Sequence, residues 1–252
     1  MIKNLPDIIL NDVSKIYTNG TVALQNVNLV IQQSEFVSLI GASGCGKSTV
    51  LRIIAGLGNP SSGSVELNIK ERKLSFVFQD AALMPWANVS ENVYLPLKLA
   101  GVPKKDAVLQ VKQAVARVGL EGFENNYPRQ LSGGMKMRVS IARALVQKPD
   151  ILLMDEPFGA LDEITRSKLN AELLDLWHQH RWTVVFVTHN IYEAVYLSNR
   201  VLVMGNSPGR VVADINIDTP YPRSEAFRTS VEYNEYCRQV SKHLSRADEK
   251  IT

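Results

Sequence analysis

Apolar residues follow two spacings in turn along the chain, and their alternation predicts an α/β fold. From residue 8 to residue 40 the pattern is β-rich, and its last segment, 36–40, is a mostly apolar run that stops at Gly41. Residues 48–57 then carry apolar side chains at helical spacing. The order is therefore strand, glycine-rich loop, helix. The strands predicted in this part lie at 8–10, 22–31 and 36–40.

Helical spacing dominates the middle of the chain, between residues 89 and 148. We interpret this stretch as an α-helical subdomain inserted into the α/β core. The runs that follow it return to the continuous apolar character of parallel strands that are covered on both faces. The further elements predicted are strands at 63–69, 74–78, 151–154 and 183–187, and helices at 104–119, 133–147 and 163–179.

The length suits one large domain with a sizeable insertion, because 252 residues amount to more than one domain at about 150 residues each. We divide the chain into a catalytic α/β core at 1–88 and 149–218, a helical subdomain at 89–148 and a C-terminal helical tail at 219–252. Apolar residues recur at helical spacing in this tail. It is predicted to pack on the core as a closing helix.

The composition excludes several classes of protein. Apolar residues make up 45% of the chain and charged residues 21%, which argues against a disordered, collagen-like or low-complexity chain. The net charge of +3 is spread along the sequence, so nothing resembles a nucleic-acid-binding tail. Cys45 and Cys237 belong to no C-x-x-C pair, which speaks against a disulfide framework or a zinc site and suits a reducing cytosol.

The strongest local signal is the phosphate-loop motif G-x-x-x-x-G-K-[ST], which residues 41–48 satisfy between a predicted strand and a predicted helix. Its glycines let successive backbone N–H groups turn toward phosphate oxygens, and the start of the helix adds a positive dipole. Lys47 places a point charge at the β and γ phosphates, and Ser48 offers a hydroxyl to Mg²⁺. The residues expected to bind nucleotide here are Gly41, Ser43, Gly44, Cys45, Gly46, Lys47, Ser48 and Thr49.

Two adjacent acids follow the apolar strand 151–154. They stand at its carboxyl end, which is where an open parallel sheet places its ligands. Neighbouring residues at a strand end point in different directions, so we assign Asp155 to the metal shell and Glu156 to orienting or deprotonating the attacking water. The alternative is a pair of solvated acids that opens the loop before Pro157.

Ser132, Gly133 and Gly134 come at the start of a predicted helix and form a second anion site of the helix-start type. One nucleotide needs one phosphate nest, so a second nest suggests a nucleotide held by another copy. Here the chain resembles the ABC ATPases, whose signature motif these residues match. The resemblance implies a P-loop NTPase core, made of a RecA-like sheet and an antiparallel β subdomain, with an inserted α-helical subdomain. It also implies a homodimer that sandwiches two ATP, with Mg²⁺, between phosphate loops and signature motifs.

The resemblance extends from about residue 8 to residue 218 and gives roles to further residues. Tyr17 matches an aromatic that stacks on adenine, with an ordinary strand-end tyrosine as the alternative. Gln79 matches the glutamine that senses Mg²⁺ and the γ-phosphate, and His189 matches the switch histidine. Asp162 matches the loop that crosses the dimer interface, a role that can coexist with that of a helix N-cap. The implied catalytic residues are Lys47, Gln79, Glu156 and His189, and the implied metal ligands are Ser48, Gln79 and Asp155.

Two sites depart from the family pattern. In and after the signature, Met135 and Met137 stand where the family usually has Gln, and Asn190 follows the switch histidine where Asp is frequent. In the family, Ser132 and Gly134 carry the phosphate contact. We therefore expect activity to survive both departures.

Residues 156–162 resemble the importer branch of the family. Residues 188–198 and 207–210 resemble, more specifically, its nitrate, sulfonate and taurine group. They imply the ATP-hydrolysing subunit of an importer that takes up a small solute such as nitrate, a sulfonate or taurine. An ABC exporter ATPase and a soluble ABC ATPase that acts on nucleic acid are the alternatives.

The resemblance also implies partners. These are a second copy of the chain, transmembrane permease subunits and, indirectly, an external solute-binding protein, with no nucleic acid. The permease contact is expected at residues 81–92, with Trp86 as its anchor, and ordinary packing between the subdomains is the alternative. Nowhere do about 18 uncharged apolar residues run together. We therefore expect a peripheral protein, held by the permease at the cytoplasmic face of the inner membrane.

Overall fold

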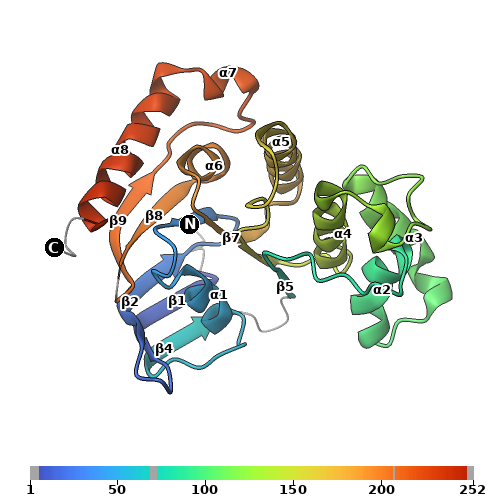
Figure 1. Cartoon of the computed structure of the whole chain (residues 1–252), viewed down its shortest axis with the longest axis horizontal. Helices are drawn as coiled ribbons and strands as arrows, with labels where there is room; N and C mark the ends of the chain where they lie inside the picture. The colour runs from blue at the N-terminus through green and yellow to red at the C-terminus, as the bar shows by residue number, and fades with distance from the viewer. Residues whose placement is uncertain (1–5, 69–72, 207, 249–252) are drawn as a thin grey trace, which may run out of the picture. The chain divides into compact units, whose positions relative to one another are not determined.

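The structure is a computed structural model of the chain, and it describes residues 6–68, 73–206 and 208–248. The chain divides into two compact units (Figure 1). Unit 1 comprises Met1–Glu71 and Leu173–Thr252, and unit 2 comprises Arg72–Glu172. The second boundary falls inside helix α5, Glu163–His180. Each unit carries a part of the predicted site.

Unit 1 is built on two sets of strands. The smaller set is antiparallel, in the order β2-β1-β4. In the larger set β7, β3 and β8 run parallel, and β9 lies antiparallel beside β8. All residues of β3 and β7 are buried, as in parallel strands that are covered on both faces. The strands are β1 (Ile8–Ile16), β2 (Val22–Ile31), β3 (Phe36–Ile40), β4 (Ser62–Leu67), β7 (Thr183–Thr188), β8 (Arg200–Gly205) and β9 (Arg210–Asn216).

The helices that lie wholly in unit 1 are α1 (Lys47–Ile54), α6 (Ile191–Leu197), α7 (Glu225–Arg228) and α8 (Val231–Asp248). Helix α8 packs along β8 and β9 and also contacts α6 (Figure 1). Phe36 anchors the core of this unit, because its ring lies 5.8 Å from that of Trp177 and 5.9 Å from that of Phe186. Helices α7 and α8 lie in the stretch predicted as a C-terminal helical tail.

Unit 2 combines a pair of parallel strands, β5 and β6, with a cluster of helices. Helix α2 packs against both α3 and α4. It begins with a capping box, in which the Asn88 side chain accepts from the N–H of Glu91 and the Glu91 carboxylate accepts from the N–H of Asn88. The elements are β5 (Leu74–Val77), α2 (Val89–Leu99), α3 (Lys104–Arg117), a 3₁₀ turn (Pro128–Gln130), α4 (Gly133–Leu145) and β6 (Ile151–Asp155).

The predicted helices are present, with some ends displaced. The helix predicted at 104–119 ends at Arg117, because Gly119 turns with a φ of 66°. The helix predicted at 48–57 ends earlier, at Ile54. Helices α4 and α5 lie within two residues of their predicted ends. The finer division that sets 89–148 apart as a subdomain stays a prediction.

The strands differ more from the prediction. The strand predicted at 8–10 continues as β1 to Ile16, and the end predicted for another strand at Ile69 lies outside the described residues. Strands β8 and β9 and helix α6 were not predicted. With seven residues, α6 is too short to show a helical period in the sequence. In the described part of the chain, no helix has both the length and the apolar character that crossing a membrane requires.

Candidate functional site

The phosphate loop joins β3 to α1 in unit 1. Strand β3 ends at Ile40, and α1 begins at Lys47. Between them the chain turns through Gly44 and Gly46, whose φ values of 81° and 97° lie in the left-handed region that residues with a Cβ disfavour. A Cβ on Gly46 would also lie 2.8 Å from the carbonyl oxygen of Ala23. The backbone of this turn therefore requires glycine at both positions.

The Lys47 side chain folds back onto the loop that precedes it. Its ammonium donates to the carbonyl oxygens of Gly41 at 2.8 Å and Ala42 at 2.9 Å, and the residue is 4% exposed. Ser43 and Gly44 on the same loop are exposed. A buried cation and a solvent-facing glycine-rich backbone thus share one turn, which suits an anion with several oxygens.

Cys45 lies on the inner side of the phosphate loop, and its residue is 1% exposed. A Cβ on Gly41 would come within 2.7 Å of its sulfur atom, so the thiol fills the space beneath the start of the loop. Its side chain therefore packs inside the unit.

Tyr17 and Thr49 meet beside the loop. Their hydroxyl oxygens lie 3.1 Å apart and share a hydrogen bond. Tyr17 is 39% exposed, and the ammonium of Lys15 lies 5.5 Å from the centroid of its ring. The contact joins the residue predicted to stack on adenine to the first turn of the helix predicted to receive phosphate.

The register of the parallel strands in unit 1 places His189 next to the phosphate loop. Strand β3 pairs with β7, and Ile40 is aligned with Thr188. Gly41 directly follows β3 and His189 directly follows β7. Both segments therefore leave the sheet at the same edge, which is the carboxyl end of the two strands. His189 is exposed, whereas Thr188 is buried. The histidine is therefore presented to solvent at the edge where the phosphate loop begins.

A second group of predicted residues gathers at one strand edge of unit 2. Strands β5 and β6 are parallel, and Val77 is aligned with Met154. Gln79 follows the first of these strands by two residues, and Asp155 and Glu156 continue directly from Met154. Asp155 is 7% exposed, whereas Gln79 is exposed. The unit thus brings an amide and two carboxylates to the carboxyl end of its strands.

Glu156 adopts an uncommon backbone conformation. Its φ of 44° lies in the left-handed region, which few residues other than glycine occupy. The N–H of Gly159 donates to its carbonyl oxygen at 3.1 Å and closes the turn. Strain of this kind gathers at functional sites. The turn also separates the two acids, because Asp155 ends the buried strand and Glu156 begins a half-buried loop.

The signature residues form the N-terminus of α4 in unit 2. The Ser132 hydroxyl accepts from the N–H of Met135 at 3.2 Å, as an N-cap does. Ser132 and Gly133 are exposed, and a Cβ on Gly134 would lie 3.1 Å from the Thr165 methyl group. The start of α4 therefore lies beside the start of α5. Since the cap uses the backbone of Met135, the methionine side chain does not disturb this turn.

Asp162 caps the N-terminus of α5. Its Oδ1 accepts from the N–H of Thr165 at 3.0 Å, and this hydrogen bond lowers the pKa of the Asp162 carboxyl below its ordinary value. Arg166, a residue that the sequence pattern did not single out, donates to the carbonyl oxygens of Leu161 at 2.7 Å and Phe158 at 3.3 Å. The loop predicted to cross a dimer interface is thus held by the helix that follows it.

Relatives match this chain along most of its length. Residues 24–159 match the family described as ABC transporter. The chain belongs to the ABC transporter family.

An uncharacterised ABC transporter ATP-binding protein of Methanocaldococcus jannaschii is 49% identical over 227 residues, 88% of this chain and 84% of the relative. The aliphatic sulfonates import ATP-binding protein SsuB of Bacillus cereus is 46% identical over 239 residues, 92% of this chain and 93% of the relative. The dimeric structure of an ATP-binding cassette in a post-hydrolysis state, bound to ADP and Pi, matches with a TM-score of 0.76 at 36% identity and covers 84% of this chain and 100% of that one.

Membership of the ABC transporter family confirms three predictions from the sequence. These are the ABC ATPase resemblance, the P-loop α/β fold and the ATPase activity coupled to transport. The roles given to single residues stay predictions. Of the segments that resemble the importer branch, the one at 207–210 begins with Ser207, which lies outside the described residues.

Arg143 of this ABC ATPase holds the segment that follows Gln79. Its guanidinium donates to the carbonyl oxygens of Ala81 at 2.7 Å and Ala82 at 2.9 Å. Burial lowers the pKa of Arg143, although arginine stays charged in proteins. No local pattern in the sequence marks this residue, because its partners lie about sixty positions earlier.

Asn92 holds the next part of the same segment from within α2. The residue is fully buried, accepts from the N–H of Met84 at 2.8 Å, and donates to the carbonyl oxygens of Ala87 and Asn88, each at 3.0 Å. The backbone between these anchors carries Trp86, which is 76% exposed. An exposed tryptophan on an anchored loop is an unusual feature of a protein surface.

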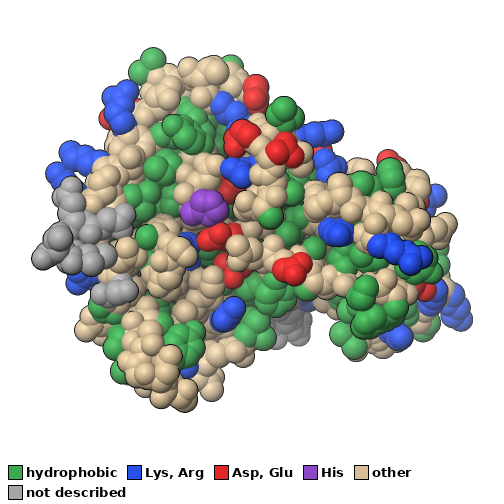
Figure 2. All heavy atoms as spheres, viewed as in Figure 1, with side chains coloured by type: hydrophobic (Ala, Val, Ile, Leu, Met, Phe, Trp, Pro, Cys, Tyr) green, Lys and Arg blue, Asp and Glu red, His purple; other side chains and the backbone are tan. Residues whose placement is uncertain are grey.

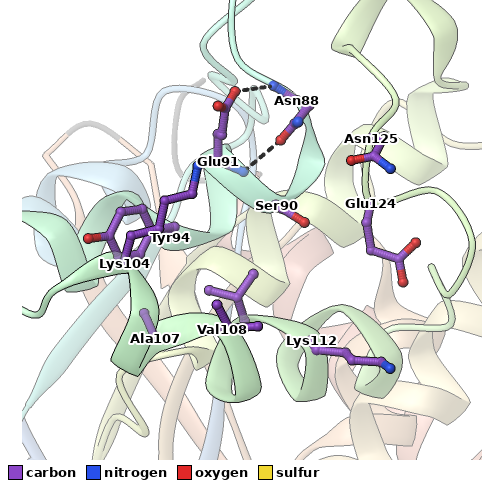
Figure 3. A pocket seen from close by; sticks show the side chains of 11 residues that line it. Asn88, Ser90, Glu91, Tyr94, Lys104, Ala107, Val108, Lys112, Glu124 and Asn125 are labelled. Atoms are coloured by element: carbon purple, nitrogen blue, oxygen red, sulfur yellow. Dashed lines mark hydrogen bonds between the residues drawn. The ribbon is translucent and has the colours of Figure 1, made fainter.

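A pocket of about 460 Å³ lies between α2 and α3 in unit 2. Figure 3 shows Val108 and Lys112 on one wall, from α3, and Asn88, Ser90 and Glu91 on the opposite wall, from α2 and the turn before it. Val108 is 60% exposed, so the wall formed by α3 is partly apolar. The remaining lining residues are Tyr94, Lys104, Ala107, Val111, Glu124 and Asn125.

The residues predicted to hold Mg²⁺ fit that ion by their chemistry. Ser48, Gln79 and Asp155 supply hydroxyl, amide and carboxylate oxygens, the donors that Mg²⁺ prefers. Among the described residues, no group of three or more His, Cys, Asp and Glu side chains could hold a metal. Such a group is not needed, because Mg²⁺ in nucleotide sites is bound through one or two carboxylates, such as that of Asp155, and its shell is filled with substrate phosphates, water and neutral oxygen donors.

Proposed function

We propose that this ABC ATPase is the ATP-hydrolysing subunit of a membrane importer and that it works as a homodimer with two MgATP between its copies. A separate permease would carry the solute, a small molecule of the sulfonate, nitrate or taurine kind. The observation that carries the proposal is the alignment of Ile40 with Thr188, which sets His189 beside the phosphate loop. The family membership supplies the reaction, and the alignment supports the assignment of residues to it.

The nucleotide would be bound first through the phosphate loop of its own copy. Backbone N–H groups of residues 41–48 and the start of α1 receive the phosphates, and Lys47 compensates their charge. Lys47 already lies within the turn, held by two carbonyl oxygens, so a bound phosphate replaces partners that the ammonium has in the free protein. Tyr17 would meet the adenine ring, and Thr49 orients its hydroxyl.

The second copy would close on the same nucleotide with its signature residues. Ser132 and Gly133 are exposed at the N-terminus of α4, where free N–H groups and the helix dipole favour an anion. The dimeric form of the related cassette supports this arrangement. Asp162 lies on the loop beside α4 and would contact the opposing copy. Both nests favour the closed dimer only while the γ-phosphate is present, so hydrolysis would reopen it.

Hydrolysis would rest on positioning and electrostatics, as phosphoryl transfer generally does. Mg²⁺ bound to Ser48, Gln79 and Asp155 would neutralise charge that develops on the transferred group. Glu156 would orient the attacking water from its strained turn. His189 would contact the γ-phosphate, and Lys47 would stabilise the developing negative charge.

The membrane partner would be met by unit 2. The segment 81–92 is held by buried hydrogen bonds and exposes Trp86, as an interface anchor does. The pocket between α2 and α3 adjoins this segment, since Asn88, Ser90 and Glu91 belong to both. The chain would then be peripheral at the cytoplasmic face of the membrane. The import of aliphatic sulfonates, as named for the Bacillus cereus relative, supports an importer over an exporter.

The charges on the surface suit such a partner better than a polyanion. On the face shown in Figure 2, Lys and Arg side chains are scattered among Asp and Glu side chains and are not gathered into one basic patch. The net charge of +3 agrees with this distribution. Nucleic-acid binding depends on a concentrated basic surface.

The test is the steady-state ATPase rate of the wild type and of Glu156→Gln, combined with the molecular mass of each in the presence and absence of ATP. We expect the wild type to hydrolyse ATP. We expect Glu156→Gln to bind ATP, to turn over at least about 100-fold more slowly, and to form a dimer that persists while ATP is bound.

The matched control is Glu235→Gln, which makes the same chemical change at an exposed acid on α8 that pairs with Arg238. This control should behave as the wild type does. A normal ATPase rate in Glu156→Gln would refute the assignment of this residue. A mutant that turns over slowly but stays monomeric with ATP would refute the dimer.

A further inference from the structure

Helix α6 connects the predicted switch histidine to the rest of unit 1. It spans Ile191–Leu197 and so begins two residues after His189. Its seven residues are too few for a helix that is stable by itself, so its position depends on tertiary contacts. These contacts come in large part from the C-terminal tail.

Arg223, in the tail, holds the C-terminal end of α6. Its Nη1 donates to the carbonyl oxygens of Val195, Tyr196 and Ser198, each at 2.9 Å. Its Nη2 donates to two further carbonyl oxygens within 217–219. The residue is 5% exposed. A buried cation that binds the last carbonyl groups of a helix compensates the negative end of the helix dipole.

Two tyrosines of the tail extend this contact along α6. The hydroxyl of Tyr233, on α8, donates to the carbonyl oxygen of Tyr192 at 2.8 Å. The hydroxyl of Tyr221 donates to the carbonyl oxygen of Leu197 at 2.9 Å. Burial raises the pKa of both hydroxyls above their ordinary value, so both remain donors at working pH. The tail therefore binds α6 at its first turn and at its last.

The first turn of α6 is bonded in turn to the residues on either side of His189. The Thr188 hydroxyl donates to the buried Glu193 carboxylate and accepts from the N–H of Asn190 at 3.0 Å. The Asn190 side chain accepts from the N–H of Glu193 at 3.2 Å. The backbone that carries the histidine is thus tied to α6 both before and after that residue. A displacement of α6 would displace His189.

We propose that Arg223 is a positioning residue for ATP hydrolysis: the tail holds α6, and α6 sets the place of His189 beside the phosphate loop. The inference rests on the role proposed above for His189. In the described part of the chain, no hydrogen bond of Arg223, Tyr221 or Tyr233 goes to the phosphate loop, so we expect their effect on the reaction to pass through α6. Three residues of the C-terminal tail, Arg223, Tyr221 and Tyr233, then affect the reaction by holding α6.

The test compares the ATPase kinetics of Arg223→Met and Arg223→Lys with those of the wild type. Methionine keeps the unbranched apolar part of the side chain but lacks the guanidinium that lies over the Tyr221 ring, and it has no donor. Since a misplacement of about 1 Å can cost up to about 100-fold in rate, we expect Arg223→Met to lower kcat by about 10-fold to 100-fold. KM for ATP should stay within about twofold, because the phosphate loop keeps its partners. Arg223→Lys, with a cation and fewer donors, should recover part of kcat.

A milder pair of variants guards against loss of folding. Tyr233→Phe removes the single hydrogen bond to α6, and we expect kcat to fall by about threefold to tenfold with KM unchanged. Tyr236→Phe makes the same change on the same helix, but its hydroxyl accepts from the N–H of Asp218 and does not contact α6. This control should keep the kcat of the wild type. Equal falls in the two variants, or a fall in neither, would overturn the proposal.

Variants of the histidine separate this proposal from the one on which it rests. If His189→Ala hydrolyses ATP as the wild type does, the role of His189 is wrong and the inference falls with it. If His189→Ala hydrolyses ATP much more slowly, at a rate that can still be measured, while Arg223→Met keeps the wild-type kcat, only the inference is wrong. If Arg223 acts through the His189 side chain, Arg223→Met should cause no further fall in kcat when it is combined with His189→Ala. A further fall of the same size would overturn the proposal, because the tail would then act elsewhere.

Discussion

Gly209 lies against the outside of the phosphate loop, and replacing it with alanine should disturb that loop without touching its sequence. The N–H of Gly209 donates to the carbonyl oxygen of Ala23 at 3.1 Å, and its own carbonyl oxygen accepts from the N–H of Gln25 at 3.0 Å. A Cβ at this position would lie 2.1 Å from the carbonyl oxygen of Cys45 and 2.9 Å from that of Ala23. Both obstacles are backbone atoms, so no side-chain rotation can relieve the contact.

The size of the effect follows from these distances. Real Cβ contacts essentially never fall below 3.0 Å, so Gly209→Ala requires a shift of at least 0.9 Å, the difference between 3.0 and 2.1 Å. Overpacking of this kind costs about 1–3 kcal/mol of folding free energy. Cys45 belongs to the phosphate loop, and a loss of about 1.4 kcal/mol in binding free energy corresponds to a tenfold loss of affinity. We therefore expect ATP to bind Gly209→Ala about 10-fold or more weakly than the wild type.

The assay measures the free energy of unfolding by urea denaturation and ATP affinity by calorimetry, the latter in the Glu156→Gln background to prevent turnover. Gly58→Ala is the matched control, because a Cβ on Gly58 has no atom within 4 Å and its φ is not positive. This control should match the background in both measurements. If Gly209→Ala also matches it, within about 0.3 kcal/mol in stability and about twofold in affinity, the reasoning from close packing against Cys45 is refuted.

Three further predictions follow from other parts of the molecule. Asn92→Ala should lower the free energy of unfolding by about 2–4 kcal/mol in urea denaturation, because buried partners of its amide lose their hydrogen bonds. The control Asn125→Ala, at an exposed asparagine, should change the free energy of unfolding little. Burial raises the pKa of the Cys237 thiol to about 11. Iodoacetamide at pH 8 should therefore label this residue slowly in the native protein and readily in urea, as mass spectrometry can show, and rapid labelling of the native protein would contradict the burial. The pKa of Asp162 is lowered in the folded state, so its stabilising effect is present above the unfolded pKa and is lost as the pH falls through the folded one. Asp162→Asn should therefore flatten the acid limb of a urea-midpoint profile, and an unchanged limb would refute this.

The site residues that could be predicted from the sequence are those whose chemistry is local in the chain. The phosphate loop is one continuous motif between a strand and a helix, and the acids of 155–156 directly follow an apolar strand. Each of these signals needs only neighbouring residues. The structure adds the conformations, such as the positive φ of Glu156, which no residue pattern announces.

Residues that act over long separations could not be predicted in this way. Arg143 binds carbonyl oxygens about sixty positions earlier, and Arg223 binds the end of a helix about 25 positions earlier. Backbone carbonyls are the same at every position, so a side chain that binds them leaves no matching partner in the sequence. Helix α6 was missed for a related reason, since seven residues supply less than the window a periodicity needs.

The signature residues could be predicted from the sequence only in part. Ser132 and the glycines after it could be recognised as an anion site because an N-cap has a local pattern. Their proximity to the loop around Asp162 depends on α4 and α5 starting side by side, which only the structure shows. The homodimer proposed above rests on the claim that a second copy completes the nucleotide site.

The most direct test of that claim is to measure mass and bound nucleotide together, for Glu156→Gln with and without Ser132→Arg, in the presence of ATP and Mg²⁺. We expect Glu156→Gln to form a dimer with two ATP. We expect the double variant to bind one ATP per chain through its own phosphate loop but to remain a monomer, because in the proposed dimer the exposed Ser132 binds the nucleotide of the other copy. Two results would contradict the proposed dimer. One is that Glu156→Gln binds ATP but stays a monomer, and the other is that the monomeric double variant no longer binds ATP.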